Sequence, residues 1–282
     1  MAVAAAGSLL VAVADFPAHA AVSNTPPEAA TRDYESCLGT ARSDGEAALA
    51  LADMLAADGH SRAAAHCRAV AYTTLDRPAD AAAALLRLAE QTDADAEKDG
   101  LHGDRLRLEA ARLFHQAGNP EAARSVLGTI VNGAADPTRN DILMSASLLS
   151  ADLAWSARDL NAVETSLDRA ASIDPDAPAV LVRRAALFRA RNNPQAAVDL
   201  LARPELETPP PEILLERGLA NLDTGRLPAA RADWVRLIAL YPDSAAANAA
   251  RRNLDRLEAT LESLDTGRTV DPDRGETPGS DR

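Results

Sequence analysis

Small apolar residues recur with a period of 33 or 34 residues, and this repeat constrains the fold more than any other feature of the chain. Ala151, Ala185 and Gly218 form one column with that spacing. A second column follows it by 12 positions and holds Val163, Ala197 and Ala230. Two earlier, less regular copies keep the same offset, at Ala69 with Ala81 and at Ala111 with Ala123. Small residues on two facing helices let the backbones approach closely, so the sequence predicts repeated helix hairpins.

Each copy of the pattern consists of a helix, a tight turn and a second helix, and the copy at 211–244 shows this best. Gly225 lies where its first helix ends, and Pro242 stops its second helix. The pattern resembles the tetratricopeptide repeat, a helix hairpin of ~34 residues. The resemblance implies an all-α fold, a right-handed superhelical solenoid closed by capping helices.

The resemblance also divides the chain. It covers residues 62–244, in five repeats at 62–95, 104–137, 144–177, 178–210 and 211–244. Residues 21–61 are predicted to form a degenerate amino-terminal cap. Residues 245–263 have apolar side chains at helical spacing among charged ones, which predicts a capping helix. Residues 264–282 are polar and contain proline and glycine, so we expect a disordered tail.

The first 20 residues indicate export. They are apolar, too short to span a bilayer, and end in Ala18-His19-Ala20, which fits the small-x-small rule of signal peptidase. No basic residue precedes the apolar run and Asp15 interrupts it, so an alanine-rich cytosolic tail is the alternative. We predict a bacterial protein exported to the periplasm, with the cytoplasm as the alternative location.

Composition narrows the function. A formal net charge of -13 argues against nucleic acid or an anionic membrane as the main partner. The sequence contains 5 histidines and 2 cysteines and has no HExxH, CxxC, GxSxG or glycine-rich phosphate loop. His66 and Cys67 are adjacent and would point about 100° apart on a helix, which is poor geometry for a nucleophile and its base. We therefore predict no enzyme, no cofactor and no metal site.

The two cysteines lie in the first helices of consecutive hairpins. In tetratricopeptide arrays these helices pack side by side, so the resemblance makes a Cys37–Cys67 disulfide reachable. In an oxidising periplasm this disulfide would stabilise the degenerate cap by linking it to the first repeat. Two small buried thiols are the alternative.

The resemblance further implies where a ligand binds, because the first helices of such arrays line a concave groove. The groove positions that we carry over are His66, Val70, Thr73, Arg105, Leu108, Arg112, His115, Leu148, Asp152, Trp155, Val182, Ala186, Arg189, Glu212, Leu215, Leu219 and Leu222. Trp155 would be an anchor for a partner unless it packs against its neighbours. Trp234, on a second helix, is predicted to be core.

These observations predict a non-enzymatic scaffold that binds a protein or peptide in the groove, with a basic and polar centre and an apolar carboxyl-terminal end. A cytosolic adaptor or regulatory subunit is the first alternative. An enzyme or small-ligand binder that uses the groove is the remote one. Self-association through the apolar carboxyl-terminal repeats also stays open.

Overall fold

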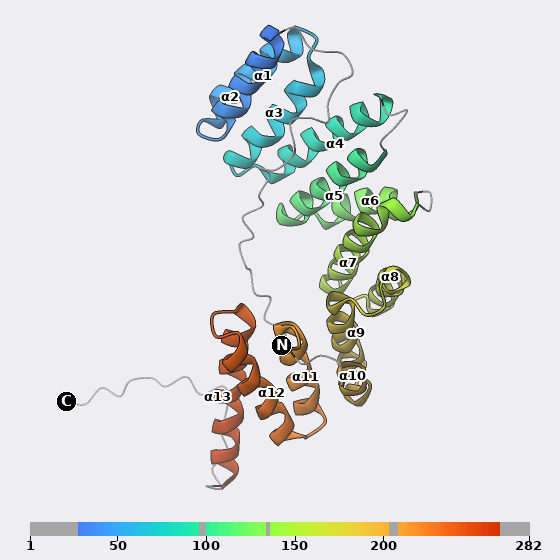
Figure 1. Ribbon diagram of the computed structural model, residues 1–282, viewed down its shortest axis with the longest axis vertical. Helices are drawn as coiled ribbons and strands as arrows, with labels where there is room; N and C mark the ends of the chain where they lie inside the picture. Colours follow the sequence, from blue (N-terminus) through green and yellow to red (C-terminus); the bar gives the residue numbers. More distant parts are fainter. Residues whose placement is uncertain (1–27, 96–99, 134–135, 203–207, 266–282) are drawn as a thin grey trace, which may run out of the picture. The chain divides into compact units, whose positions relative to one another are not determined.

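The computed structural model describes residues 28–95, 100–133, 136–202 and 208–265, and these are almost entirely helical (Figure 1). The predicted all-α fold is confirmed. In chain order the helices are α1 (Glu28–Ala41), α2 (Gly45–Ala57), α3 (Ser61–Thr74), α4 (Pro78–Asp95), α5 (Gly100–Gln116), α6 (Pro120–Val131), the 3-10 helix η1 (Pro137–Arg139), α7 (Asn140–Ser156), α8 (Leu160–Ile173), α9 (Pro178–Ala190), α10 (Pro194–Leu201), α11 (Pro211–Asp223), α12 (Leu227–Leu240) and α13 (Ala245–Asp265). The handedness of the superhelix stays a prediction.

The helices form two compact units. The first unit extends to Leu153 and the second begins at Ala154, so the boundary lies within α7. Within each unit, helices that follow one another in the chain pack together, and α6 and α7 do so through a shared buried cluster. First helices of neighbouring hairpins are also in contact, as α1 with α3 and α9 with α11, and α11 contacts the last helix, α13.

The turns inside five hairpins, from α3–α4 to α11–α12, share one backbone conformation. Each of these turns has a residue with positive φ, which is 54° at Asp76, 71° at Gly118, 60° at Arg158, 57° at Asn192 and 76° at Gly225. The next residue donates its N–H to a carbonyl five positions earlier, as Asn193 does to Phe188 at 2.9 Å. This is the Schellman motif, which ends a helix by satisfying its last carbonyls. The hairpins therefore turn in the same way, although only two of the five positions carry the expected glycine.

A polar cap starts the second helix directly after three of these turns. The side chains of Asn119 and Asp159 accept from backbone N–H groups three residues on, at 3.1 and 3.0 Å, and Asn193 does the same at 3.4 Å. Such caps satisfy donors that a helix start leaves open. In these three hairpins the turn and the cap together define where the second helix begins.

The core repeats a pairing of a small with a large residue. A small residue of the first helix shares a buried cluster with a large one 16 positions later, at Ala69 with Leu85, Ala111 with Leu127, and Ala185 with Leu201. In the α11–α12 hairpin the pair is Gly218 with Trp234, and Trp234 is fully buried as predicted. The largest side chain thus faces the smallest residue, so the change in one side-chain volume offsets the change in the other.

The carboxyl-terminal end of the helical array differs in detail from the sequence prediction. The last helix includes residues 264 and 265, which the sequence predicts to belong to the tail. The predicted signal segment at 1–20 and the tail from 266 lie outside the described residues. Within the described ranges, no helix is long and apolar enough to cross a membrane.

Candidate functional site

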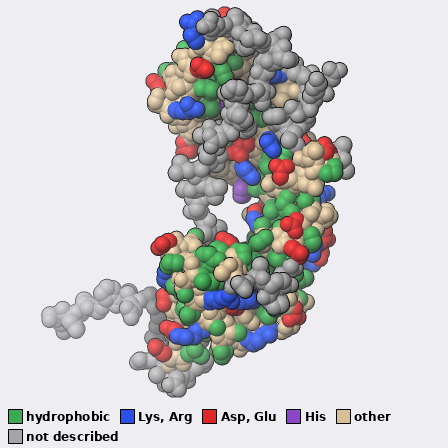
Figure 2. All heavy atoms as spheres, in the orientation of Figure 1, with side chains coloured by type: hydrophobic (Ala, Val, Ile, Leu, Met, Phe, Trp, Pro, Cys, Tyr) green, Lys and Arg blue, Asp and Glu red, His purple; other side chains and the backbone are tan. Residues whose placement is uncertain are grey.

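The second unit presents an apolar surface on two neighbouring first helices. We call it the first-helix face, and it consists of Val182, Ala186, Leu215, Leu219 and Leu222, all half-buried. Val182 packs on the core of α9 and α10, whereas the three leucines pack on the core of α11, α12 and α13. Figure 2 shows hydrophobic and basic side chains together on the surface of the second unit. Val182 and the three leucines are thus packed on a core on their inner side and accessible on the other.

An ion-pair network joins the two helices of this face. Arg189 on α9 donates to Glu216 Oε1 at 2.8 Å and to Asp223 Oδ2 at 2.7 Å, both on α11. Burial raises the pKa of the Glu216 carboxyl, and the adjacent Arg189 acts in the opposite direction. The sequence prediction had Arg189 facing a partner. Its guanidinium instead fixes α9 against α11.

A second, more buried network joins α11 to α12. Arg217 Nε lies 3.1 Å from both carboxylate oxygens of Asp233, and Asn221 Nδ2 donates to Oδ2 at 3.0 Å. Asn221 and Asp233 are buried. This network was not predicted from the sequence. The one signal for a buried ion pair was the charge of Asp233 directly before Trp234, which was predicted to be core.

The predicted basic centre lies on α5 in the first unit. Arg105 and Arg112 have side chains about half exposed, at 49% and 50%, and they pair with Asp141 at 3.5 Å and Glu109 at 3.2 Å. His115 at the end of α5 is exposed. The Arg105–Asp141 pair is solvated on both sides and therefore weak, whereas the Glu109 side chain is only 13% exposed.

The placement of Leu108 as a groove residue was wrong. Its side chain is only 7% exposed and packs in the α5–α6 core, so it offers no surface to a partner. Groove positions were carried over from one repeat to the next, but burial at this position depends on the neighbouring helices.

The predicted groove residues Asp152 and Trp155 lie on different sides of the boundary between the two units. Asp152 is half-buried in the first unit, and Trp155 is half-buried in the last turn of α7, which belongs to the second unit. The second unit brings Arg189 together with Leu215, Leu219 and Leu222, because α9 and α11 are in contact.

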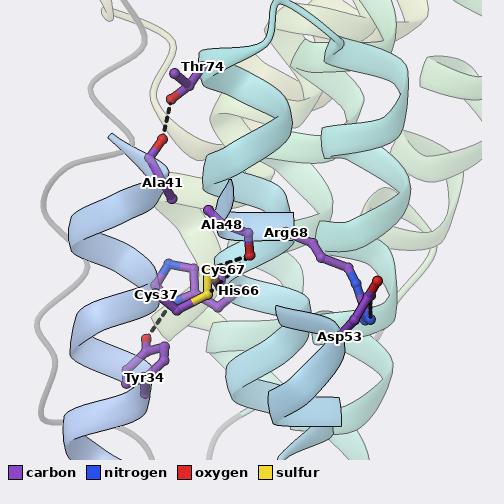
Figure 3. Close-up of a disulfide and its surroundings, with 9 residues drawn as sticks. All are labelled: Tyr34, Cys37, Ala41, Ala48, Asp53, His66, Cys67, Arg68 and Thr74. Carbon is purple, nitrogen blue, oxygen red and sulfur yellow. Dashed lines mark hydrogen bonds and ion pairs between the residues drawn. A yellow bond between two sulfur atoms is a disulfide. The ribbon is translucent and has the colours of Figure 1, made fainter. Parts of the chain in front are cut away.

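The cysteine pairing is present as expected. Cys37 on α1 and Cys67 on α3 form a disulfide with a Cα–Cα distance of 6.1 Å, and both residues are fully buried (Figure 3). The two sulfurs lie 3.5 and 3.9 Å from the carbonyl oxygen of Ala48 on α2. The bridge thus lies where the first three helices meet. Among the described residues, no group of three His, Cys, Asp or Glu side chains could hold a metal ion.

Comparisons with known proteins give structural neighbours only. No family model matches the chain, and no curated protein does. A chain in the crystal structure of the APC/C hetero-tetramer Cut9–Hcn1 superposes with a TM-score of 0.41 at 16% identity, over 79% of this chain and 48% of that one. The assembly chaperone of RpL4, Acl4 (residues 1–338), gives a TM-score of 0.33 at 18% identity, over 83% and 91% of the two chains. The chain thus spans about half the length of the first neighbour.

Proposed function

We propose that the protein is a non-enzymatic scaffold that binds a segment of a partner protein on the first-helix face. One observation carries the proposal: the three half-exposed leucines of α11 stand beside Val182 and Ala186 of α9, while the adjacent charges are paired within the protein. Such a surface offers apolar contact at reduced desolvation cost, because Arg189, the charge between the two helices, is already paired with Glu216 and Asp223.

The geometry of the face favours a helical or extended segment as the ligand. Leu215, Leu219 and Leu222 are spaced i, i+4 and i+7, so they form one stripe of about 10 Å along α11. An amphipathic segment with apolar anchors at similar spacing would cover that stripe. Trp155 is a further candidate anchor, since tryptophan is enriched among residues that dominate binding energy.

We place this function in the periplasm of a Gram-negative bacterium. The Cys37–Cys67 disulfide supports an oxidising compartment. Residues 1–20 support export through their apolar run and the Ala18-His19-Ala20 site. A role in assembling envelope machinery is consistent with both.

Site-specific photo-crosslinking tests the proposal. A diazirine amino acid is introduced in place of Leu219 on the first-helix face, and in a second variant in place of Val235, which is 44% exposed on α12. Irradiation in the producing cells is expected to yield a discrete protein adduct from position 219 and none from 235. Protein adducts from both positions alike, or none from position 219, would contradict binding on this face. Equal melting temperatures of the two variants and the wild type serve as the control for folding.

A further inference from the structure

Helix α1 is attached to α3 through three contacts on one side. Tyr34 Oη lies 2.5 Å from His66 Nδ1, Cys37 is bridged to Cys67, and Thr74 Oγ1 donates to the carbonyl oxygen of Ala41 at 2.6 Å (Figure 3). On α1 these positions are spaced i, i+3 and i+7, which places them on one face of a helix. The disulfide is the middle and only covalent contact of the three.

The apolar packing of α1 is slight. Among residues 31–41 only Cys37 and Ala41 are buried, and the two larger apolar side chains, Tyr34 and Leu38, are half-buried. By contrast, α3 buries five residues between α2 and α4. A single helix of 14 residues is marginal in water without tertiary packing. The position of α1 therefore depends on the bridge far more than that of any neighbouring helix of the unit.

We propose that α1 is a clasp on the first unit, locked by the Cys37–Cys67 disulfide and released when a dithiol reductant opens that bond. In the first step a thiolate of the reductant attacks one sulfur, and the other leaves as a thiolate that takes up a proton. The second thiol of the reductant then displaces the first cysteine, which is protonated in turn. The bridge gains two electrons and two protons, and the reductant ends as its own disulfide.

Because the disulfide is buried, its reduction requires a prior movement of α1. Both cysteines have no exposed surface, so a reductant reaches a sulfur only after α1 has moved away from α2 and α3. Opening exposes part of the buried cluster that α1 shares with α2 and α3, to which Ala48, Ala52, Ala64 and Ala71 belong. The remaining helices keep their own cores, because α3, α4 and α5 share a separate buried cluster.

Hydrogen–deuterium exchange on the full-length protein tests the clasp. Reduction with dithiothreitol is expected to speed amide exchange in residues 31–41 on the order of 100-fold, while α4 and α5 change by no more than a few-fold. The variant Cys37→Ala/Cys67→Ala should show the fast exchange without reductant. Thr74→Val, which removes a hydrogen bond but keeps the bridge, should retain slow exchange until it is reduced.

Two results would overturn the clasp. Unchanged protection of residues 31–41 after complete reduction would mean that packing alone holds α1. An equal rise in exchange across α1 to α6 would mean that the bridge supports the whole unit. The alkylated mass of both cysteines confirms in each case that reduction was complete.

Discussion

Replacing Gly218 with alanine is expected to lower the free energy of unfolding by about 2 kcal/mol or more. The loss is expected although alanine has the higher helix propensity of the two residues. The added Cβ would lie 2.3 Å from Nε1 and 2.7 Å from Cδ1 of Trp234. The indole has little room to yield, because it is fully buried and its Nε1–H points to the carbonyl oxygen of Leu215 at 3.4 Å. Urea denaturation followed by circular dichroism measures the change.

Gly128→Ala is the matched control. Gly128 lies inside α6, and a Cβ there would meet nothing within 4 Å. The same substitution should therefore raise the free energy of unfolding by about 1 kcal/mol, the ordinary gain from glycine to alanine inside a helix. A loss of stability in both variants would show that contact with Trp234 is not the cause.

A double-mutant cycle tests the pairing itself. Trp234→Leu alone leaves a cavity over Gly218 and should cost about 2 kcal/mol or more. Gly218→Ala/Trp234→Leu recreates the alanine–leucine pair that the α9–α10 hairpin has at Ala185 and Leu201. The double variant should be more stable than the sum of the two single changes predicts, with a coupling of about 1–3 kcal/mol. Additive changes would contradict a shared packing site.

Removing the carboxylate of Asp233 is expected to destabilise the protein by about 3–5 kcal/mol. In Asp233→Ala the guanidinium of Arg217 and the amide of Asn221 both lose their acceptor in a buried site. An uncompensated charge in such surroundings is costly, because little water reaches the Arg217 and Asp233 side chains, which are 18% and 10% exposed. Thermal and urea unfolding of the variant measure the loss.

Asp168→Ala provides the comparison for that prediction. Asp168 on α8 also pairs with an arginine on a neighbouring first helix, Arg184, but its side chain is 63% exposed. Solvated pairs of this kind contribute little, so the expected change is less than about 1 kcal/mol. Losses of equal size from Asp168→Ala and Asp233→Ala would show that burial does not set the difference.

The sequence revealed the hairpins because close helix packing restricts residue size at fixed positions. Ala185 and Gly218 recur at one spacing since a larger side chain there would separate two backbones. The disulfide was predicted from the resemblance to tetratricopeptide arrays, in which neighbouring first helices pack side by side, and the structure contains the Cys37–Cys67 bridge.

The charge pairs and the exact burial of the face could not be predicted in this way. Arg189 pairs with Glu216, 27 positions away, and nothing in the local sequence selects that carboxylate over others nearby. Leu108 and Leu219 were both assigned to the groove, yet the first is buried and the second half-buried, because neighbouring helices cover them differently. A repeat pattern fixes where a position lies on its own helix, but not what packs over it.

The measurement that tests the scaffold proposal most directly is the affinity of the segment crosslinked at position 219 for two variants of the protein, in each of which one alanine is replaced by glutamine. Ala186→Gln adds bulk on the first-helix face, whereas Ala232→Gln adds the same bulk on the exposed side of α12. Titration calorimetry should show the Kd rising at least ~10-fold for Ala186→Gln, a loss of about 1.4 kcal/mol. It should change less than about twofold for Ala232→Gln. An unchanged Kd for Ala186→Gln, with both variants as stable as the wild type, would contradict binding on this face.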